Sequence, residues 1–89
     1  MKNMNINKIR IKLDKVDDKL LKTIKERTLL VDKILKLKKN KNQIIDQKRI
    51  NFILKRVKKF SKKAKIDPAI TLNIWKVMIK GFINYEYKK

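Results

Sequence analysis

Apolar residues recur at helical spacing along the whole chain, and the pattern is clearest in the first 39 residues. Stepping 100° per residue, seven apolar positions lie within about 40° of one line on a single helix face: Ile9, Leu13, Val16, Leu20, Ile24, Val31 and Ile34. This pattern predicts a helix from about residue 5 to about residue 39. Such a helix is roughly 50 Å long, and the rest of an 89-residue chain is too small to cover its apolar face along that whole length. We therefore expect two chains to pack together and cover it.

Two shorter helices are predicted after a polar loop at residues 39–45. Asp46 is a good N-cap for a helix over about 46–65, and Asp67 followed by Pro68 opens a third helix over about 68–87. Gly81 and Pro68 are the only glycine and proline in the chain. We therefore expect an all-α fold, with residues 1–89 forming one small helical domain.

Charged residues interrupt the apolar face of every predicted helix. Arg27 and Lys38 lie on the line of the first stripe, and Glu86 continues the line of Trp75, Ile79 and Phe82 on the third helix. On the second helix, two charged residues lie within about 40° of the stripe that includes Ile50 and Phe60: Asp46 and Arg49. Lys38 and Glu86 lie near helix ends and alone fit a frayed end or a snorkelling side chain, but Arg27 lies inside the first helix with apolar residues on both sides. Buried charge is costly unless it is paired, so the set predicts a polar site in a helical core.

The three cations Arg27, Lys38 and Arg49 favour a small anion, most simply a dicarboxylate held by arginine forks. The sequence has no histidine or cysteine, no glycine-rich phosphate loop and no cluster of metal ligands. We expect no metal and no cofactor, and an enzyme built from these parts would act by positioning and electrostatics.

The net charge of +19 makes polyanion binding an alternative. Only four of the 27 cations are arginine, however, and lysine, asparagine and isoleucine all have A/T-rich codons. The lysines are spread over all segments, so nucleic acid is the less favoured partner. The cysteine-free sequence has no signal peptide and no apolar run of about 20 residues, so we expect a cytoplasmic protein that does not bind membranes.

Three segments together resemble the all-helical chorismate mutase family, from about Ile9 to Glu86: IRIKLDKVDDKLLKTIKERTLLVDKILKLKK, IIDQKRINFILKRVKKFSKKAKIDPAI and IWKVMIKGFINYE. The most specific part is an arginine, a second arginine 17 residues later and a lysine 11 further on, matched by Arg10, Arg27 and Lys38. Asp46 and Arg49 match the Asp-x-x-Arg that opens the second helix.

The resemblance implies an intertwined homodimer that converts chorismate to prephenate in the shikimate pathway of aromatic amino acid biosynthesis. It implies that Arg27 and the partner chain's Arg10 clamp the substrate carboxylates, and that Lys38 hydrogen-bonds the ether oxygen. Asp46 and Arg49 would close the site at the ring end. The spacing of the two arginines agrees with a site shared between chains. Arg10 and Arg27 are roughly 25 Å apart on one helix, too far to bind the same small molecule. If two first helices pair antiparallel about residue 21, Arg10 lies opposite residue 32, between Arg27 and Lys38.

The sequence departs from the family pattern at three positions. Ile50 replaces a glutamate that receives the ring hydroxyl, Phe82 replaces a small hydroxyl residue, and Glu86 replaces a glutamine that donates to the ether oxygen. An apolar residue at the first of these positions and an aromatic residue on the third helix also occur in the isochorismate-pyruvate lyase branch of the fold, which forms salicylate and pyruvate. That lyase activity is the alternative to chorismate mutase. A non-catalytic basic dimer that binds nucleic acid is the third, less favoured hypothesis.

Overall fold

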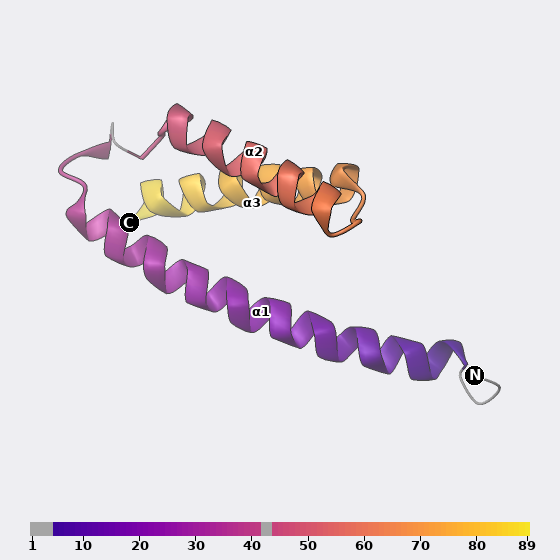
Figure 1. Ribbon diagram of the computed structural model, residues 1–89. Helices are drawn as coiled ribbons and strands as arrows, with labels where there is room; N and C mark the ends of the chain where they lie inside the picture. The colour runs from indigo at the N-terminus through magenta and orange to yellow at the C-terminus, as the bar shows by residue number, and fades with distance from the viewer. Residues whose placement is uncertain (1–4, 42–43) are drawn as a thin grey trace. The chain divides into compact units, whose positions relative to one another are not determined.

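The structure is a computed structural model that describes residues 5–41 and 44–89. It contains three helices, α1 (Ile6–Leu37), α2 (Gln47–Lys63) and α3 (Pro68–Lys88), and the described residues form no strand (Figure 1). The all-α prediction with a long first helix is confirmed, and each helix begins and ends within two residues of its predicted bounds. Residues 42 and 43 of the predicted loop 39–45 lie outside the described residues.

Capping side chains set where each helix begins. The Asp46 carboxylate accepts a hydrogen bond from the backbone N–H of Arg49 at 3.0 Å, and Asp67 accepts one from Ala69 at 2.9 Å. Pro68 occupies the first turn of α3, where its missing N–H costs nothing. At the start of α1, the Asn5 side chain accepts from the N–H of Lys8 at 2.9 Å. Both predicted aspartate caps are therefore confirmed.

The chain divides into two compact units, residues 1–33 and residues 34–89. The first unit consists of α1 up to Lys33, and no residue of α1 is buried. Its apolar stripe lies open to water: Leu13, Val16 and Leu20 each keep more than half of their surface exposed. A bare amphipathic helix gains little stability from its own hydrogen bonds, so this stripe calls for a covering surface. The prediction that residues 1–89 form one domain stays a prediction.

The second unit is built on a hairpin of α2 and α3, which pack side by side (Figure 1). Ile44 and Ile79 are its buried apolar residues, and Ser61 is 1% exposed. The Ser61 hydroxyl lies 2.6 Å from that of Thr71 and also donates to the carbonyl of Val57 at 2.7 Å. This hydroxyl pair ties the end of α2 to the start of α3.

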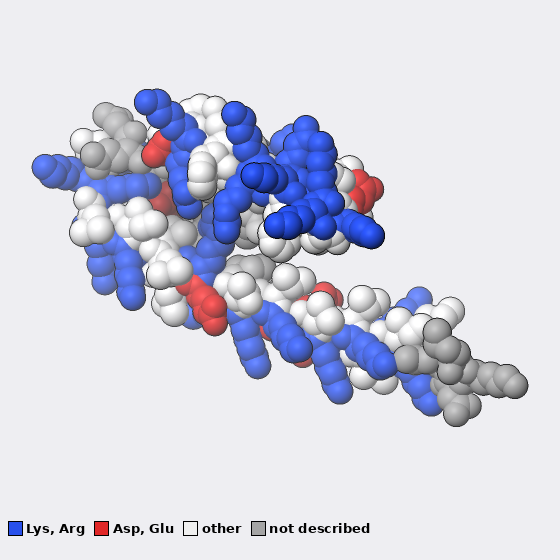
Figure 2. All heavy atoms as spheres, viewed as in Figure 1, with Lys and Arg blue, Asp and Glu red and all other residues white. Residues whose placement is uncertain are grey.

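The turn between α2 and α3 is a Schellman motif. The N–H of Ile66 donates to the carbonyl of Ser61 at 2.8 Å, and that of Lys65 donates to Lys62 at 3.3 Å. Lys65 takes the left-handed conformation that the motif requires, with φ of 58°. Around this hairpin, lysine and arginine side chains cover much of the surface in view (Figure 2). The hairpin thus presents a small apolar interior and a strongly basic exterior.

Candidate active site

An ion pair between Lys38 and Glu86 is the central feature of the second unit. The Lys38 Nζ lies 3.3 Å from the Glu86 Oε1, although the two residues are 48 positions apart in sequence. Lys38 follows the last residue of α1, and Glu86 lies in the last turn of α3. Their side chains are 18% and 8% exposed. The pair is therefore largely shielded from water, where a charge-assisted hydrogen bond is strong.

The backbone around this ion pair is held from both sides. The N–H of Lys38 donates to the carbonyl of Leu35 at 3.2 Å, which continues the last turn of α1. Lys41, three residues on, donates its ammonium to the carbonyl of Tyr87 at 3.2 Å. A cation is favourable at this carbonyl because it lies at the negative end of the α3 dipole. The two contacts fix the start of the loop against the end of α3 and so keep Lys38 beside Glu86.

The hydrogen-bond donors and acceptors that the ion pair leaves unused determine what ligand atom it can bind. An ammonium has three N–H donors, so Lys38 can bind an oxygen of a ligand while it still bonds to Glu86. An ionised Glu86 can only accept hydrogen bonds, whereas its protonated form also donates one. The Lys38 ammonium therefore suits an oxygen atom that gains negative charge, whereas an ionised Glu86 holds the ammonium in place and offers that oxygen no hydrogen bond.

Phe82 lies one helical turn before Glu86 on the same face of α3. It is half-buried, and its ring meets that of Tyr85 edge-to-face with the centroids 6.3 Å apart. A half-buried aromatic next to the ion pair gives this end of the hairpin an apolar wall.

The start of α2 carries three of the candidate site residues. Asp46 and Arg49 are both exposed in the single chain, while Ile50 is half-buried. The Asp46 carboxylate is engaged as the N-cap of α2, and the Arg49 guanidinium lies 5.1 Å from the centroid of the Phe52 ring. A cation above an aromatic face is attracted by the ring quadrupole, so Phe52 steadies Arg49 in the absence of a ligand. The pattern placed both charges near the core stripe, but neither is covered within one chain.

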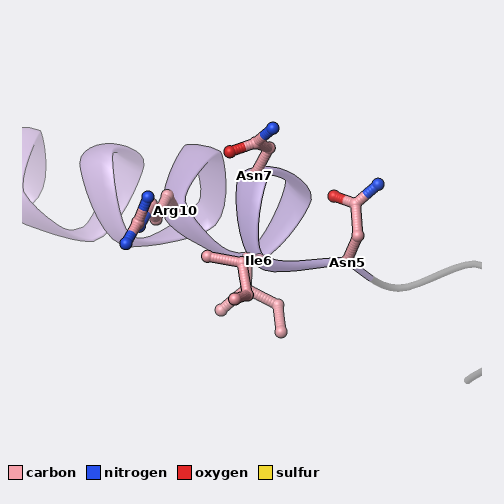
Figure 3. A pocket seen from close by; sticks show the side chains of 5 residues that line it. Asn5, Ile6, Asn7 and Arg10 are labelled. Carbon is pink, nitrogen blue, oxygen red and sulfur yellow. The ribbon is translucent and has the colours of Figure 1, made fainter.

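Arg10 and Arg27 belong to the first unit. Arg10 is exposed beside an open hollow that Asn5, Ile6, Asn7 and Ile9 also line (Figure 3). Arg27 is half-buried farther along α1. Because α1 is one continuous helix, the 17 residues between them span about 25 Å. One chain cannot close both guanidinium groups on the same small molecule.

Two contacts of the second unit were not predicted from the sequence. Lys41 is one of many lysines, and nothing in its neighbours indicates that it binds the carbonyl of Tyr87. Phe52 lies three residues after Arg49, a spacing at which helical side chains meet, so its contact with Arg49 could have been anticipated.

Two general properties complete the description of residues 5–41 and 44–89. They include no group of three or more histidine, cysteine, aspartate or glutamate side chains placed to hold a metal ion. None of their helices combines the length and the apolar character needed to span a membrane.

Comparisons with known proteins agree on one family. The family model for chorismate mutase type II matches residues 9–87. A chorismate mutase of Methanocaldococcus jannaschii is 33% identical over 73 residues, which cover 81% of this chain and 74% of that protein. No solved structure matches the chain with comparable significance.

Proposed function

Because the chain belongs to the chorismate mutase type II family, we propose that it converts chorismate to prephenate at a site shared between two copies. The chain is thus an isomerase of aromatic amino acid biosynthesis. The reaction rearranges bonds within one molecule: a C–O bond breaks as a C–C bond forms. It needs no nucleophile, so a site of fixed charges suffices. The reducing cytoplasm is the proposed location, consistent with a sequence that lacks cysteine.

The observation that carries the proposal is the Lys38–Glu86 ion pair. These are the two groups that the family resemblance assigns to the ether oxygen of the substrate. Their contact at 3.3 Å holds the Lys38 ammonium in place, and this ammonium keeps N–H donors available for the ether oxygen. As the C–O bond breaks, negative charge grows on that oxygen, and the Lys38 ammonium stabilises it more in the transition state than in the ground state. This differential interaction lowers the barrier.

The uncovered stripe of α1 supports a second copy as the missing surface. Six of its seven apolar side chains are exposed in the single chain, Val31 is half-buried, and α1 has no buried residue. Pairing two α1 helices antiparallel about residue 21 would bury both stripes at once. Arg10 of one copy would then lie opposite residue 32 of the other, between Arg27 and Lys38. Arg10 and Arg27 would each bind a substrate carboxylate through a bidentate fork.

The first turn of α2 is proposed to meet the ring end of the substrate. Arg49 is exposed and Asp46 holds the turn that presents it. Ile50 and Phe82 are half-buried and apolar, so they shape this end of the site without offering a hydrogen bond.

A second candidate, isochorismate-pyruvate lyase, is favoured by these two apolar residues. With Ile50 in place of a carboxylate, the ring hydroxyl of chorismate has no acceptor from this position. Isochorismate carries its hydroxyl elsewhere on the ring and would not need that acceptor.

Incubation of the purified protein with each substrate separately tests the proposal. Chorismate mutase activity yields prephenate from chorismate. Lyase activity yields salicylate and pyruvate from isochorismate, and a larger kcat/KM for that reaction would reverse the order of the two candidates. Turnover of neither substrate would contradict both.

A further inference from the structure

The cations of α2 are concentrated and unbalanced. The 17 residues from Gln47 to Lys63 include eight lysines and arginines and no acidic residue. All eight are exposed, and Figure 2 shows lysine and arginine side chains crowded over this helix. By contrast, the 32 residues of α1 carry five acidic side chains among their cations. An A/T-rich codon bias raises the number of lysines throughout a chain. The electrostatic field around α2, however, depends only on where its charges lie.

Four lysines of α2 lie in one line along the helix. Stepping 100° per residue, they fall within about 40° of the direction of Lys59: Lys48, Lys55, Lys59 and Lys63, called here the α2 lysine row. The half-buried Ile50 and Val57 lie about 160–180° away. The row therefore faces away from the packed side of the helix, and away from the ion pair of Lys38 and Glu86.

The row is self-repulsive as it stands. Lys55, Lys59 and Lys63 are spaced four residues apart, where like charges destabilise a helix. None of them forms an ion pair with the described residues of the chain. The row extends over about 22 Å of helix. A matching row of external anions would remove the repulsion.

We propose that the α2 lysine row binds the phosphate backbone of a nucleic acid duplex. A duplex presents about one negative charge per 1.7 Å of its axis, so a straight row of cations meets phosphates along its whole length. Lysine ammonium groups are point charges rather than forks, so they suit phosphates better than base edges and carry no sequence preference. This surface is separate from the proposed enzyme site and does not depend on it.

An anionic membrane fits the same helix less well. Interfacial helices bury a continuous apolar face in the lipid, but the apolar face of α2 packs against α3. Along the row itself, Phe52 is the large apolar side chain left exposed. The row thus offers positive charge to a partner, but it has little apolar surface that could insert into a membrane.

Two triple variants with equal charge separate the row from the total charge of the protein. One carries Lys55→Gln, Lys59→Gln and Lys63→Gln. The matched control carries Lys15→Gln, Lys22→Gln and Lys33→Gln on the polar side of α1, where all three lysines are exposed. Affinity for a 20-base-pair DNA duplex, an RNA duplex and phosphatidylserine vesicles is measured across a salt series. Far-UV circular dichroism monitors the folding of each variant independently of any enzyme activity.

The row variant is expected to bind duplexes about 10²-fold more weakly near 0.1 M salt, with the salt slope reduced by about 2.7, because three phosphate contacts are lost. The control should lose far less, and Lys→Arg replacements at Lys55, Lys59 and Lys63 should retain binding. The difference between DNA and RNA arms identifies the preferred duplex. Equal losses in the two triple variants would overturn the proposal, and so would a selective loss on vesicles but not on duplexes.

Discussion

Lys38 already donates to Glu86 in the free chain, so the ether oxygen of a substrate would share or replace that contact. Lys38→Ala removes a hydrogen bond that strengthens as charge develops, and we expect kcat/KM to fall by roughly 10²–10³, or about 2–4 kcal/mol in barrier. Lys58→Ala, an exposed position on α2, is the control and should leave turnover unchanged. Retention of full activity by the Lys38→Ala enzyme would remove Lys38 from the mechanism.

Glu86 gives the second prediction at the scale of single residues. An ionised carboxylate offers no hydrogen bond to an oxygen that gains negative charge. Glu86→Gln keeps an oxygen that can accept from Lys38 and adds a permanent N–H donor. On the proposed mechanism, we expect the variant to have an equal or greater kcat/KM for chorismate at neutral pH. A comparison of kcat/KM in the two proteins under the same conditions checks this. A marked loss of activity in the Glu86→Gln variant would mean that a donor at this position does not assist the reacting oxygen.

Among the elements, the α2–α3 hairpin depends on the hydroxyl pair of Ser61 and Thr71. Ser61 donates to the carbonyl of Val57, and Thr71 lies 2.6 Å from the Ser61 hydroxyl and 3.4 Å from the carbonyl of Pro68. Ser61→Ala removes the shorter of the two Thr71 contacts and leaves the longer one, so we expect a loss of about 0.5–1.5 kcal/mol in the free energy of unfolding.

The double variant Ser61→Ala with Thr71→Val is the informative comparison. It removes both polar groups, and the remaining loss should be smaller than the sum of the two single losses. Urea unfolding of the three variants measures these values. Strict additivity would mean that the 2.6 Å contact contributes no coupling to the hairpin.

Sequence reasoning reached the helices and caps because their signals are local. The apolar period sets the length of α1, and Asp46 and Asp67 lie directly before the helices that they cap. The same period placed Lys38 and Glu86 on inward-facing lines, and the structure brings them into contact.

The other features depend on how packed helices are rotated and on what covers them. Ser61 and Thr71 could each have faced water, and their contact follows from the crossing of α2 and α3. Arg49 lies near the apolar stripe on a helical wheel but is exposed in one chain. A helical wheel gives the direction of a side chain and not the neighbour that it meets.

At the scale of the whole molecule, the proposed shared site predicts complementation. A chain with Arg10→Ala and a chain with Arg27→Ala should each be inactive as homodimers. In a heterodimer, one site contains both altered residues and the other contains neither. Refolding an equal mixture should therefore restore about one quarter of natural activity, since half of the dimers are mixed and each has one intact site. Formation of mixed dimers without recovery of turnover would contradict the proposal that Arg10 and Arg27 of different chains form one site.

The proposed pairing of two α1 stripes also predicts that the enzyme is sensitive to dilution. If the stripe finds its cover only in a second copy, association and the helicity of α1 are linked by mass action. Lowering the protein concentration below the dissociation constant should reduce helical circular dichroism and specific activity together, because a bare α1 frays in water. A saturating substrate analogue should shift both curves to lower concentration, since a ligand bound across two chains holds them together. The length of one helix would then set the lowest protein concentration at which the enzyme works.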